Sequence, residues 1–487
     1  MTASSRRRLS LGASTVEEVI SATQGTGLFS RLMQLAVGLA IGTDGIEITL
    51  LSYLIPCVAA DWGLSTLEQG SLTASVFAGE LVGAMFIGVF SDKYGRRLGF
   101  LVATVLVVVF GLLTVAAPSF WWLLLSRSMV GVGAGGMEVP FDLLSEIVPI
   151  KHKRRILMGV QVTWAGGSLF VGLMAWAVLS FGYSWRWLAL FSAVPPLTVL
   201  LCFTFIPESP CWLMANGREK EASVVLRKIA KTNGIELAEL SLVHEEESLG
   251  EKSGIGALWS RPAIRKRCIT ACVVWGSFGF MYYGVILLSA KVLGTASTCS
   301  FDYGILSFAS SSELVASAIT GLYMHLLDRR IVMTLNFLLS AFTSLALALS
   351  ISTGWLLITS FTTRGTAYVA ANFAWLLTPE LFPTEVRSTG HAICNSVARF
   401  GAIGASYWVD SSVPNRGIAT LLMAVGIIGG VAGQMLPGNP RTEGNRGNDS
   451  RRFSAESTPL LSGLREDRSK ASHAGTEVNP FEDGDRP

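Results

Sequence analysis

The sequence predicts an all-α membrane protein in which twelve transmembrane helices form two related six-helix bundles. Three observations predict this fold class: long apolar segments, basic residues on alternate connections between them, and an internal repeat. The chain has 487 residues, of which 50% are hydrophobic and only 15% are charged, and its mean hydropathy is +0.49. This composition is too apolar for a soluble protein of several domains.

A helix that spans a membrane needs about 20 predominantly apolar residues. Twelve segments meet this requirement, so both ends of the chain are expected on the same side of the membrane. The segments are 32–58, 70–90, 98–117, 120–149, 156–180, 186–206, 268–292, 302–326, 331–352, 355–379, 388–410 and 417–436.

Basic residues predict that this side is the cytosol, because cytoplasmic connections are enriched in Lys and Arg. No apolar core precedes Leu32, so we expect no cleaved signal peptide and a cytosolic N-terminus. Alternate connections carry Lys93, Arg96, Arg97, Lys151, Lys153, Arg154, Arg155, Arg329, Arg330 and Arg387, against Arg186, Lys291 and Arg416 on the others.

The chain divides into five expected parts. A cytosolic linker separates the bundles, and its residues 218–231 place Ala222, Val225, Leu226 and Ile229 on one stripe, which predicts an amphipathic helix lying under the membrane. The C-terminal tail is polar and nearly free of aromatic residues, so we expect it to be disordered. The parts are a cytosolic N-terminal segment (1–31), a first bundle (32–206), the linker (207–267), a second bundle (268–436) and the cytosolic tail (437–487).

Several functional classes lack support. The seven cysteines lie mostly in apolar segments without a CxxC pair, so we expect packing residues rather than a metal site or a disulfide framework. The basic residues form short clusters and no continuous face, which excludes nucleic acid as a partner. No P-loop motif is present for ATP-driven pumping. The histidines do not cluster and no nucleophile motif occurs, so we expect neither an enzyme nor a cofactor.

An internal repeat relates the two halves of the chain. Three pairs of residues recur at nearly one offset, which predicts two six-helix halves in parallel orientation with a substrate site between them near the middle of the membrane. The copy is imperfect, because Ile331 and Val332 follow where the first half has Gly95-Arg96-Arg97. The pairs are Asp92 and Asp328 (236 positions apart), Arg127 and Arg364 (237) and Glu146 and Glu380 (234).

These motifs resemble the major facilitator superfamily over nearly all of residues 32–436. Gly88-x-x-x-Asp92-Lys93-x-Gly95-Arg96-Arg97 resembles its loop between the second and third helices, and Arg127-x-x-x-Gly131-x-Gly133 its fourth-helix signature. Pro207-Glu208-Ser209-Pro210-Cys211-Trp212-Leu213 and Pro379-Glu380-Leu381-Phe382-Pro383-Thr384-x-x-Arg387 resemble the branch of sugar porters and organic-ion transporters, with Cys211 in place of an Arg. The resemblance implies a carrier that works by alternating access.

Within that branch, the seventh helix lacks the Gln-Gln and Asn pattern of sugar porters, which makes sugar less favoured. The connections after the first and seventh helices are short, unlike the large loops of animal organic-ion transporters and synaptic vesicle glycoprotein 2. Asp44-Gly-Ile-Glu47, Tyr282-Tyr283-Gly284 and Ala398-Arg399-x-Gly401 are similar to the synaptic-vesicle-2-related group and its bacterial nicotinate-transporter relatives. Resemblance to this group implies the fold and the transport mechanism of the chain but no particular substrate.

The resemblance also implies a cytosolic latch that favours one of two conformations of the carrier. Its arginines would pair with acidic residues of neighbouring helices, Glu146 with Lys153 and Glu380 with Arg387 would brace it, and the stronger latch would belong to the first half. The alternative is a basic loop that only sets topology. The implied gate residues are Asp92, Lys93, Gly95, Arg96, Arg97, Glu146, Lys153, Asp328, Arg329, Glu380 and Arg387.

Charged residues inside the apolar segments are candidates for a substrate or proton site. A charge near the bilayer centre costs about 2.5–3.5 kcal/mol on insertion scales, a cost that usually has a functional reason. The acidic residues outnumber the basic ones by two, which favours a cation or a proton; the alternative is that they form structural ion pairs. The residues are Asp44, Glu47, Glu80, Glu138 and Asp142, against Arg127, Arg364 and Arg399.

Four further side chains, Tyr282, Tyr283, Asn372 and Trp375, are expected to face a central cavity, although aromatic residues in membrane helices pack more often than they bind. Glu313 and Trp164 are weaker candidates. The glycines of the fourth and fifth helices are expected to permit close helix approach. No metal ligands are expected.

The tail contains two strings that resemble sorting signals. Glu456 with Leu460 and Leu461 resembles an acidic dileucine signal for adaptors, and Asn479-Pro480-Phe481 resembles the ligand of an EH domain. Together they favour a plasma membrane protein that cycles through endosomes, or a protein of an endosomal or vacuolar membrane.

The sequence therefore predicts a monomeric secondary carrier in a lipid bilayer that moves a small organic ion or metabolite by alternating access, coupled to protons. Two alternatives stay open. One is a membrane sensor or vesicle-trafficking scaffold of the same fold that transports little, and the other is a sugar porter.

Overall fold

The computed structural model describes residues 7–23, 27–243, 258–259, 261–294, 299–323, 327–350, 352–382 and 386–437. The predicted disordered tail lies outside these residues, apart from Pro437, and so do Pro383 and the two sorting strings with Glu456, Leu460, Leu461, Asn479, Pro480 and Phe481.

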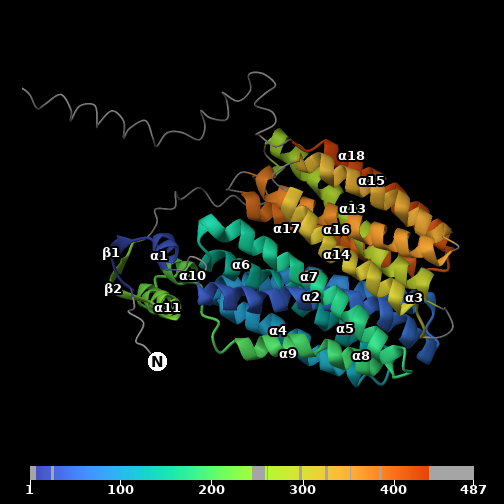
Figure 1. Cartoon of the computed structure of the whole chain (residues 1–487), viewed down its shortest axis with the longest axis horizontal. Helices are drawn as coiled ribbons and strands as arrows, with labels where there is room; N and C mark the ends of the chain where they lie inside the picture. Colours follow the sequence, from blue (N-terminus) through green and yellow to red (C-terminus); the bar gives the residue numbers. More distant parts are fainter. Residues whose placement is uncertain are drawn as a thin grey trace, which may run out of the picture. The chain divides into compact units, whose positions relative to one another are not determined.

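The first half of the molecule contains eight helices, which lie in the lower part of Figure 1 in blue to green. They are α2 (Leu28–Trp62), α3 (Thr66–Tyr94), α4 (Arg96–Val115), α5 (Phe120–Gly135), α6 (Glu138–Ile147), α7 (Ile150–Leu179), α8 (Trp185–Ser192) and α9 (Val194–Cys202).

The second half contains six helices, which lie above the first half in Figure 1 in yellow-green to red. They are α13 (Pro262–Leu293), α14 (Tyr303–Tyr323), α15 (Arg329–Leu349), α16 (Thr353–Leu381), α17 (Arg387–Val409) and α18 (Asn415–Gln434).

All twelve predicted segments coincide with helices, which confirms the helical membrane fold. Within the described residues, nine helices are long and apolar enough to cross a membrane. The other predicted spans are α16, α17 and the pair α5 and α6, and these carry many of the polar side chains of the site described below.

Two predicted helices are interrupted. The segment 120–149 breaks between α5 and α6 at Gly136 and Met137, after a run of glycines, since glycine is a weak helix former. The segment 186–206 breaks between α8 and α9 at Ala193, directly before Pro195 and Pro196, and proline favours the first turn of a new helix.

Glycines allow α3 and α5 to pack closely, as predicted. A Cβ added to Gly83 would lie 2.0 Å from the Val132 carbonyl oxygen, and one added to Gly131 would lie 2.2 Å from that of Val76. No side chain fits at such distances. The same holds between α7 and α2, where a Cβ on Gly167 would lie 2.1 Å from the Gly42 oxygen, so small residues set the spacing of these helices.

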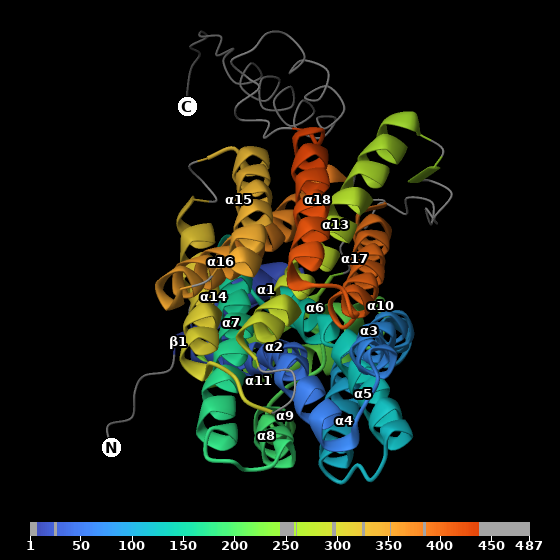
Figure 2. The ribbon, with the colours of Figure 1, turned by 90° about the vertical axis from the view of Figure 1, so that its right-hand side faces the viewer.

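The two halves meet mainly along two helix pairs. α3 packs against α17 and α7 packs against α14, and Figure 2 shows both pairs side by side. Each pair joins one helix of the first half to one of the second half. A smaller contact joins α2 to α13.

Residues of the N-terminal segment and of the linker pair in a small sheet, which the structure adds to the predicted helical fold. Strand β1 (Arg7–Ser14) pairs in parallel with β2 (Ile235–Leu242), which follows α10 (Pro210–Ala215) and α11 (Glu219–Thr232). Apolar residues alternate along both strands, for example Leu9 and Leu11 in β1, and this period of two is typical of a strand. The segment 1–31 is therefore not independent of the linker.

The segment predicted as an amphipathic helix forms α11, and its position relative to the membrane stays a prediction. Its residues Ala222, Leu226 and Ile229 are fully buried. Two of them, Ala222 and Leu226, belong to an apolar cluster that includes Val19 of α1 (Val16–Thr23) and Leu237 of β2. The apolar stripe therefore packs inside a small folded unit as well as against the bundle.

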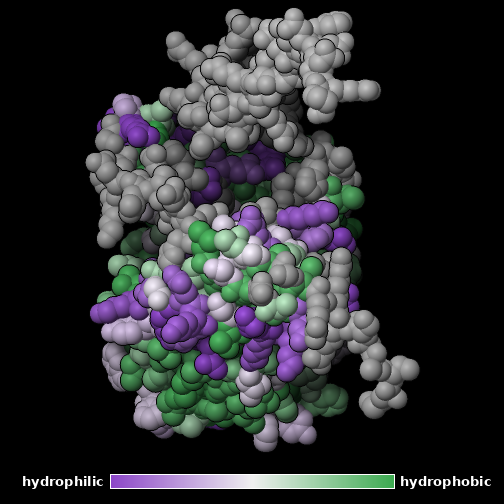
Figure 3. Space-filling model, turned by 90° about the vertical axis from the view of Figure 1, so that its left-hand side faces the viewer, coloured by the Kyte–Doolittle hydropathy of each residue, from purple (hydrophilic) through white to green (hydrophobic). Residues whose placement is uncertain are grey.

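The two ends of the helices differ in charge. The turn between α3 and α4 and the starts of α7, α15 and α17 carry the predicted basic residues, and we call this the basic end. Hydrophilic side chains gather there and hydrophobic ones cover the flank of the bundle (Figure 3). The other end, called the opposite end, contains the end of α2 and the connection between α13 and α14.

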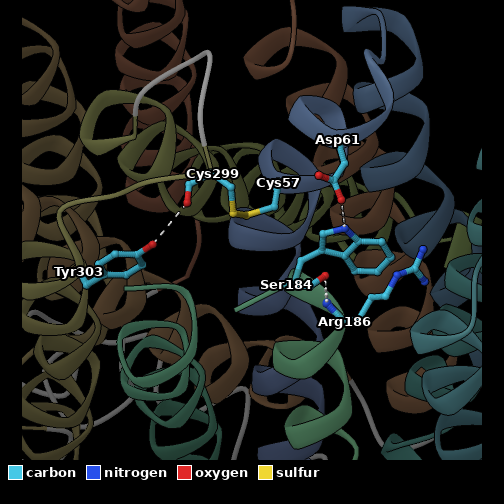
Figure 4. The surroundings of a disulfide bond; sticks show 7 residues. Cys57, Asp61, Ser184, Arg186, Cys299 and Tyr303 are labelled. Carbon is cyan, nitrogen blue, oxygen red and sulfur yellow. Dashed lines mark hydrogen bonds between the residues drawn. A yellow bond between two sulfur atoms is a disulfide. The ribbon is translucent and has the colours of Figure 1, made fainter. Parts of the chain in front are cut away.

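A disulfide bond at the opposite end corrects the prediction that all cysteines are packing residues. Cys57 of α2 is bonded to Cys299, which precedes α14, with their Cα atoms 4.5 Å apart (Figure 4). The two cysteines are 242 positions apart, and no sequence spacing predicts such a pair. Nearby, Trp185 Nε1 donates a hydrogen bond to Asp61 at 2.9 Å.

We predict that the double variant Cys57→Ser/Cys299→Ser unfolds at a lower temperature than the wild type. Removing a cross-link enlarges the unfolded ensemble, which typically lowers the free energy of unfolding by about 2–4 kcal/mol. Thermal unfolding of purified protein, followed by tryptophan fluorescence, measures the change. Cys202→Ser, which alters a free cysteine, is the matched control. An equal loss in both variants would contradict the prediction.

Candidate functional site

A chamber of 880 Å³ lies between the two halves and reaches the basic end. This volume is within the range of about 300–1,000 Å³ that is typical of ligand pockets. Figure 3 shows the hollowed surface at this end, bordered by hydrophilic side chains. Polar and charged side chains in its wall are Asp92, Arg96, Glu138, Asp142, Gln161, Asn372, Arg387, His391, Asn395 and Arg399.

A smaller recess of 80 Å³ adjoins the chamber, with which it shares Glu138, Asn372, Trp375 and Arg399. Aromatic side chains from both halves form much of its wall. Its lining includes Asp44, Trp164, Phe278, Tyr282, Tyr283 and Tyr368.

Each of the three predicted intramembrane arginines has a carboxylate partner. Arg127 lies 2.7 Å from Glu47, Arg364 lies 2.7 Å from Glu313, and Arg399 lies 2.6 Å from Glu80. The glutamate side chains are 0–2% exposed. Buried opposite charges at these distances neutralise each other.

Two of these pairs stand apart from the chamber. Glu47 and Arg127 line neither cavity, and the same is true of Glu313 and Arg364. This position favours the alternative that Glu47 and Arg127 form a structural ion pair rather than part of a substrate or proton site. Glu313 was the weaker candidate from sequence, yet it is the partner that Arg364 requires.

The third pair connects the halves. Glu80 belongs to α3 and Arg399 to α17, and Arg399 Nη1 also donates a hydrogen bond to Tyr283 Oη at 2.8 Å. Arg364 also reaches across, because its Nη2 donates to Ser168 Oγ of α7 at 2.5 Å. A polar layer therefore joins the two bundles near the middle of the helices.

Three predicted acids remain without an ion pair among the described residues, namely Asp44, Glu138 and Asp142. Asp44 Oδ2 accepts a hydrogen bond from Trp164 Nε1 at 3.0 Å, and Glu138 Oε1 accepts one from Asn395 Nδ2 at 3.3 Å. Asp142 and Glu138 lie one turn apart on α6 and both line the chamber. Arg96 and Arg399 in the cavity walls already have carboxylate partners, so three carboxylates without an ion pair remain there against the single guanidinium of Arg387.

The four predicted cavity side chains Tyr282, Tyr283, Asn372 and Trp375 all line the recess, and Asn372 and Trp375 also line the chamber. Tyr282 Oη donates to Glu313 at 2.9 Å. Asn372 Nδ2 is buried and has no hydrogen-bond partner among the described residues, so it is available to a ligand.

The first-half latch residues come together at the basic end. Arg96 forms ion pairs with Asp92 and, at 3.3 Å, with Glu146. Arg97 donates to the Ile206 carbonyl oxygen at 2.8 Å and so satisfies a carbonyl just beyond the end of α9.

Gly95 makes the turn between α3 and α4 possible. Its φ is +116°, which side chains rarely allow, and an added Cβ would lie 2.3 Å from Glu208 Oε2. Glu208 Oε1 accepts from the Arg97 backbone N–H at 3.0 Å. The Nζ of Lys93 lies 5.2 Å from the centre of the Tyr94 ring.

The second half keeps this chemistry despite its altered sequence. Arg329 pairs with Glu380 as Arg96 pairs with Glu146, and Arg330 donates to the Leu436 carbonyl oxygen at 3.0 Å as Arg97 does to Ile206. Arg330 also pairs with Asp328 at 3.2 Å. In each half the second arginine, Arg97 or Arg330, bonds a carbonyl oxygen just beyond the end of the sixth helix of that half. The contacts of the motif are therefore better preserved in the second half than its sequence indicates.

The predicted bracing pairs are different in the structure. Glu146 and Glu380 pair with Arg96 and Arg329, and within the described residues neither pairs with Lys153 or Arg387. Lys153 lies at the start of α7 and Arg387 at the start of α17, and neither side chain points to the glutamate that precedes it. Arg387 lines the chamber instead.

The opposite end is closed by contacts between the halves. Thr73 of α3 donates to Asp410 Oδ2 at 3.1 Å, and the Ser71 and Tyr407 hydroxyls lie 3.3 Å apart. The disulfide between Cys57 and Cys299 lies at the same end. The structure is therefore open toward the basic end and closed at the other.

Sequence reasoning did not single out Gln161, Tyr368 and Asn395, although all three line the recess. Helical spacing offers a signal for two of them. Gln161 lies three residues before Trp164, and Tyr368 lies four residues before Asn372, so each shares a helix face with a residue of the site.

Comparison with known proteins agrees with this geometry. The family model described as "Sugar (and other) transporter" matches residues 32–407. The synaptic vesicle 2-related protein of Xenopus laevis is 29% identical over 469 residues, which are 91% of this chain and 84% of that protein. The organic cation/carnitine transporter 7 of Arabidopsis thaliana is 29% identical over 434 residues, which are 80% of this chain and 86% of that protein.

A solved structure has the same fold. The partially occluded inward open conformation of the xylose transporter XylE from E. coli superposes with a TM-score of 0.66 at 17% sequence identity. The match covers 84% of this chain and 98% of that one. At this identity the likeness concerns the fold alone.

We predict that Glu47→Gln strongly destabilises the protein, because it leaves Arg127 buried and uncompensated. Breaking a buried ion pair in this way typically lowers the free energy of unfolding by about 3–5 kcal/mol. Thermal unfolding measures the loss, and the exposed pair of Arg218 with Glu221 provides a control through Glu221→Gln, which should change little. The double variant Glu47→Gln/Arg127→Met should be more stable than Glu47→Gln; if it is not, pairing is not the cause.

Proposed function

Because the chain belongs to the sugar (and other) transporter family of the major facilitator superfamily, we propose that it is a secondary carrier of a small organic cation. It moves this cation across a membrane by alternating access and couples the movement to protons. The family consists of transporters rather than enzymes.

The observation that carries the proposal is the unpaired acidic wall of the cavities. Asp44, Glu138 and Asp142 face the two cavities, whereas every predicted intramembrane arginine already has its glutamate. At the basic end the charges of Arg96, Lys153, Asp92 and Glu146 lie around Asp142, and within the described residues none of the basic groups forms an ion pair with it. A positively charged substrate satisfies carboxylates in an apolar wall, which neither an anion nor a neutral molecule does.

Aromatic side chains support the same substrate. Trp375 and Tyr282 lie beside the carboxylates, and a cation over an aromatic face gains about 0.5–2 kcal/mol. The name of the Arabidopsis thaliana relative, an organic cation/carnitine transporter, is consistent with this class.

The contacts at the two ends support alternating access. At the basic end the latch pairs lie within the halves, and at the opposite end Thr73 and Asp410 join the halves. Reversing this arrangement would open the chamber to the other side. We propose that the basic end faces the cytosol, as the positive-inside rule predicts.

Coupling to protons follows from Glu138 and Asp142. A carboxylate binds either a proton or a cation, so of two carboxylates one turn apart one can hold a proton while the other holds the substrate. No covalent chemistry is required. Proton and substrate then cross the membrane together.

A sugar is the second candidate, and one observation favours it. Gln161, Asn372 and Asn395 place three amide side chains on the chamber wall, and amides bind hydroxyl groups as both donors and acceptors. A neutral sugar would leave the three carboxylates unmatched, which is why we favour the cation.

We predict that the protein in proteoliposomes takes up organic cations from a panel of cations, anions and sugars, and faster with a pH gradient than without one. Glu138→Gln/Asp142→Asn should lower uptake at least about tenfold and abolish the effect of the gradient, because no exchangeable carboxylate pair remains. Glu221→Gln is the control. Uptake of sugars alone would overturn the cation assignment.

We predict that Asp92→Asn lowers uptake at least about tenfold while surface expression stays normal. The variant removes one of two carboxylates that hold Arg96 and so weakens the latch that balances the two conformations. Surface biotinylation and cation uptake are measured in the same cells. Unaltered uptake would show that the loop only sets topology.

A further inference from the structure

The recess at the inner end of the chamber has a composition that selects among cations. We propose that it binds a methylated ammonium group, with an aromatic wall around Trp164, Tyr282 and Tyr368 and with Asp44 as the counter-charge. This inference rests on the proposed function and narrows its substrate class.

The aromatic wall is continuous. The ring centre of Trp164 lies 5.6 Å from that of Tyr282 and 5.7 Å from that of Tyr368, and the two tyrosine rings are 5.8 Å apart. Tyr283 extends the wall from Tyr282 at 5.3 Å. A cation within about 6 Å of such ring centres is attracted by their electron-rich faces.

The tyrosine hydroxyls are already engaged, so the rings rather than the hydroxyls are left for a guest. Tyr282 donates to Glu313 at 2.9 Å and Tyr368 donates to the Gln161 carbonyl oxygen at 3.0 Å. Tyr283 accepts from Arg399.

Asp44 supplies a negative charge that no described residue neutralises through an ion pair. Its Oδ2 accepts from Trp164 Nε1, and its Oδ1 is buried without a hydrogen-bond partner. Arg399 also borders the recess, but Glu80 lies 2.6 Å from it and offsets its charge. With Glu138 included, the recess carries a net negative charge.

Hydrogen-bond capacity distinguishes the types of ammonium group. A primary ammonium has three N–H donors and loses free energy when they are buried without acceptors. Among the described residues that line the recess, Asp44 Oδ1 is the one side-chain oxygen that is buried without a hydrogen-bond partner, and Glu138 Oε1 already accepts from Asn395. A fully methylated nitrogen has no donor to satisfy and presents methyl groups to aromatic rings.

The sizes of the cavities fit a substrate with a compact head. The recess holds 80 Å³ and the adjoining chamber 880 Å³. A methylated ammonium head occupies the recess, and the remainder of the molecule extends into the chamber toward Asn372 and Gln161.

Binding to the purified full-length protein in lipid nanodiscs tests the proposal by calorimetry. The probes are choline, ethanolamine (the same molecule with a primary ammonium) and 3,3-dimethylbutan-1-ol (its neutral carbon analogue). We expect choline to bind at least about tenfold more tightly than either analogue. Equal or tighter binding of ethanolamine or of the neutral analogue would overturn the proposal, and this comparison needs no variant.

Variants locate the site. Tyr368→Leu and Asp44→Asn should each weaken choline binding about tenfold, whereas Tyr368→Phe, which keeps the ring, and Trp187→Leu, which alters an exposed tryptophan on α8, should retain it. Thermal unfolding confirms that each variant is folded. Unchanged binding in Tyr368→Leu would overturn the site.

The outcomes for function and for the recess are separable. Choline binding without transport of any cation would contradict the proposed function and leave the recess assignment standing. Transport of other cations by a protein that does not bind choline would contradict the recess assignment alone.

Discussion

A charge in the apolar interior of a membrane protein requires an opposite charge, and this constraint organises the centre of the molecule. Arg127 pairs with Glu47 inside the first half, and Arg364 pairs with Glu313 inside the second half. Removing either partner would leave a buried charge without compensation. Each pair joins two helices of one half, and neither uses the acids Asp44, Glu138 or Asp142.

The two halves contribute different chemistry to the site. The unpaired acids Asp44, Glu138 and Asp142 belong to the first half, and most of the rings of the recess belong to α13 and α16 of the second half. Trp164 joins Asp44 within the first half, but most of the aromatic wall meets the acids where the halves meet. In the proposed mechanism, movement of the halves would change such a site, which would link substrate binding to alternating access. The pair of Glu80 with Arg399 crosses the same boundary and moves with it.

Much of the fold could be predicted from the sequence, because apolar length, the distribution of basic residues and the repeat are local or periodic signals. The candidate residues Tyr282, Tyr283, Asn372 and Trp375 were found because they are polar or aromatic in apolar segments. The partners could not be predicted, since Arg96 and Glu146 or Cys57 and Cys299 meet only through tertiary packing. The resemblance implied Lys153 as the residue that acts with Glu146, whereas in the structure Arg96 pairs with Glu146. Strands β1 and β2 were missed because each is short and they pair across more than 200 residues.

Above all, we propose that the cavity selects substrates that carry a positive charge, and this selection can be tested. Transient currents from proteoliposomes adsorbed on a solid-supported membrane measure it most directly, because they report the charge that moves with the substrate. Our account predicts that a concentration jump of an organic cation gives a current of positive sign, that a neutral sugar gives none, and that the current disappears in Glu138→Gln/Asp142→Asn. A current evoked by sugar and by no cation would contradict the account.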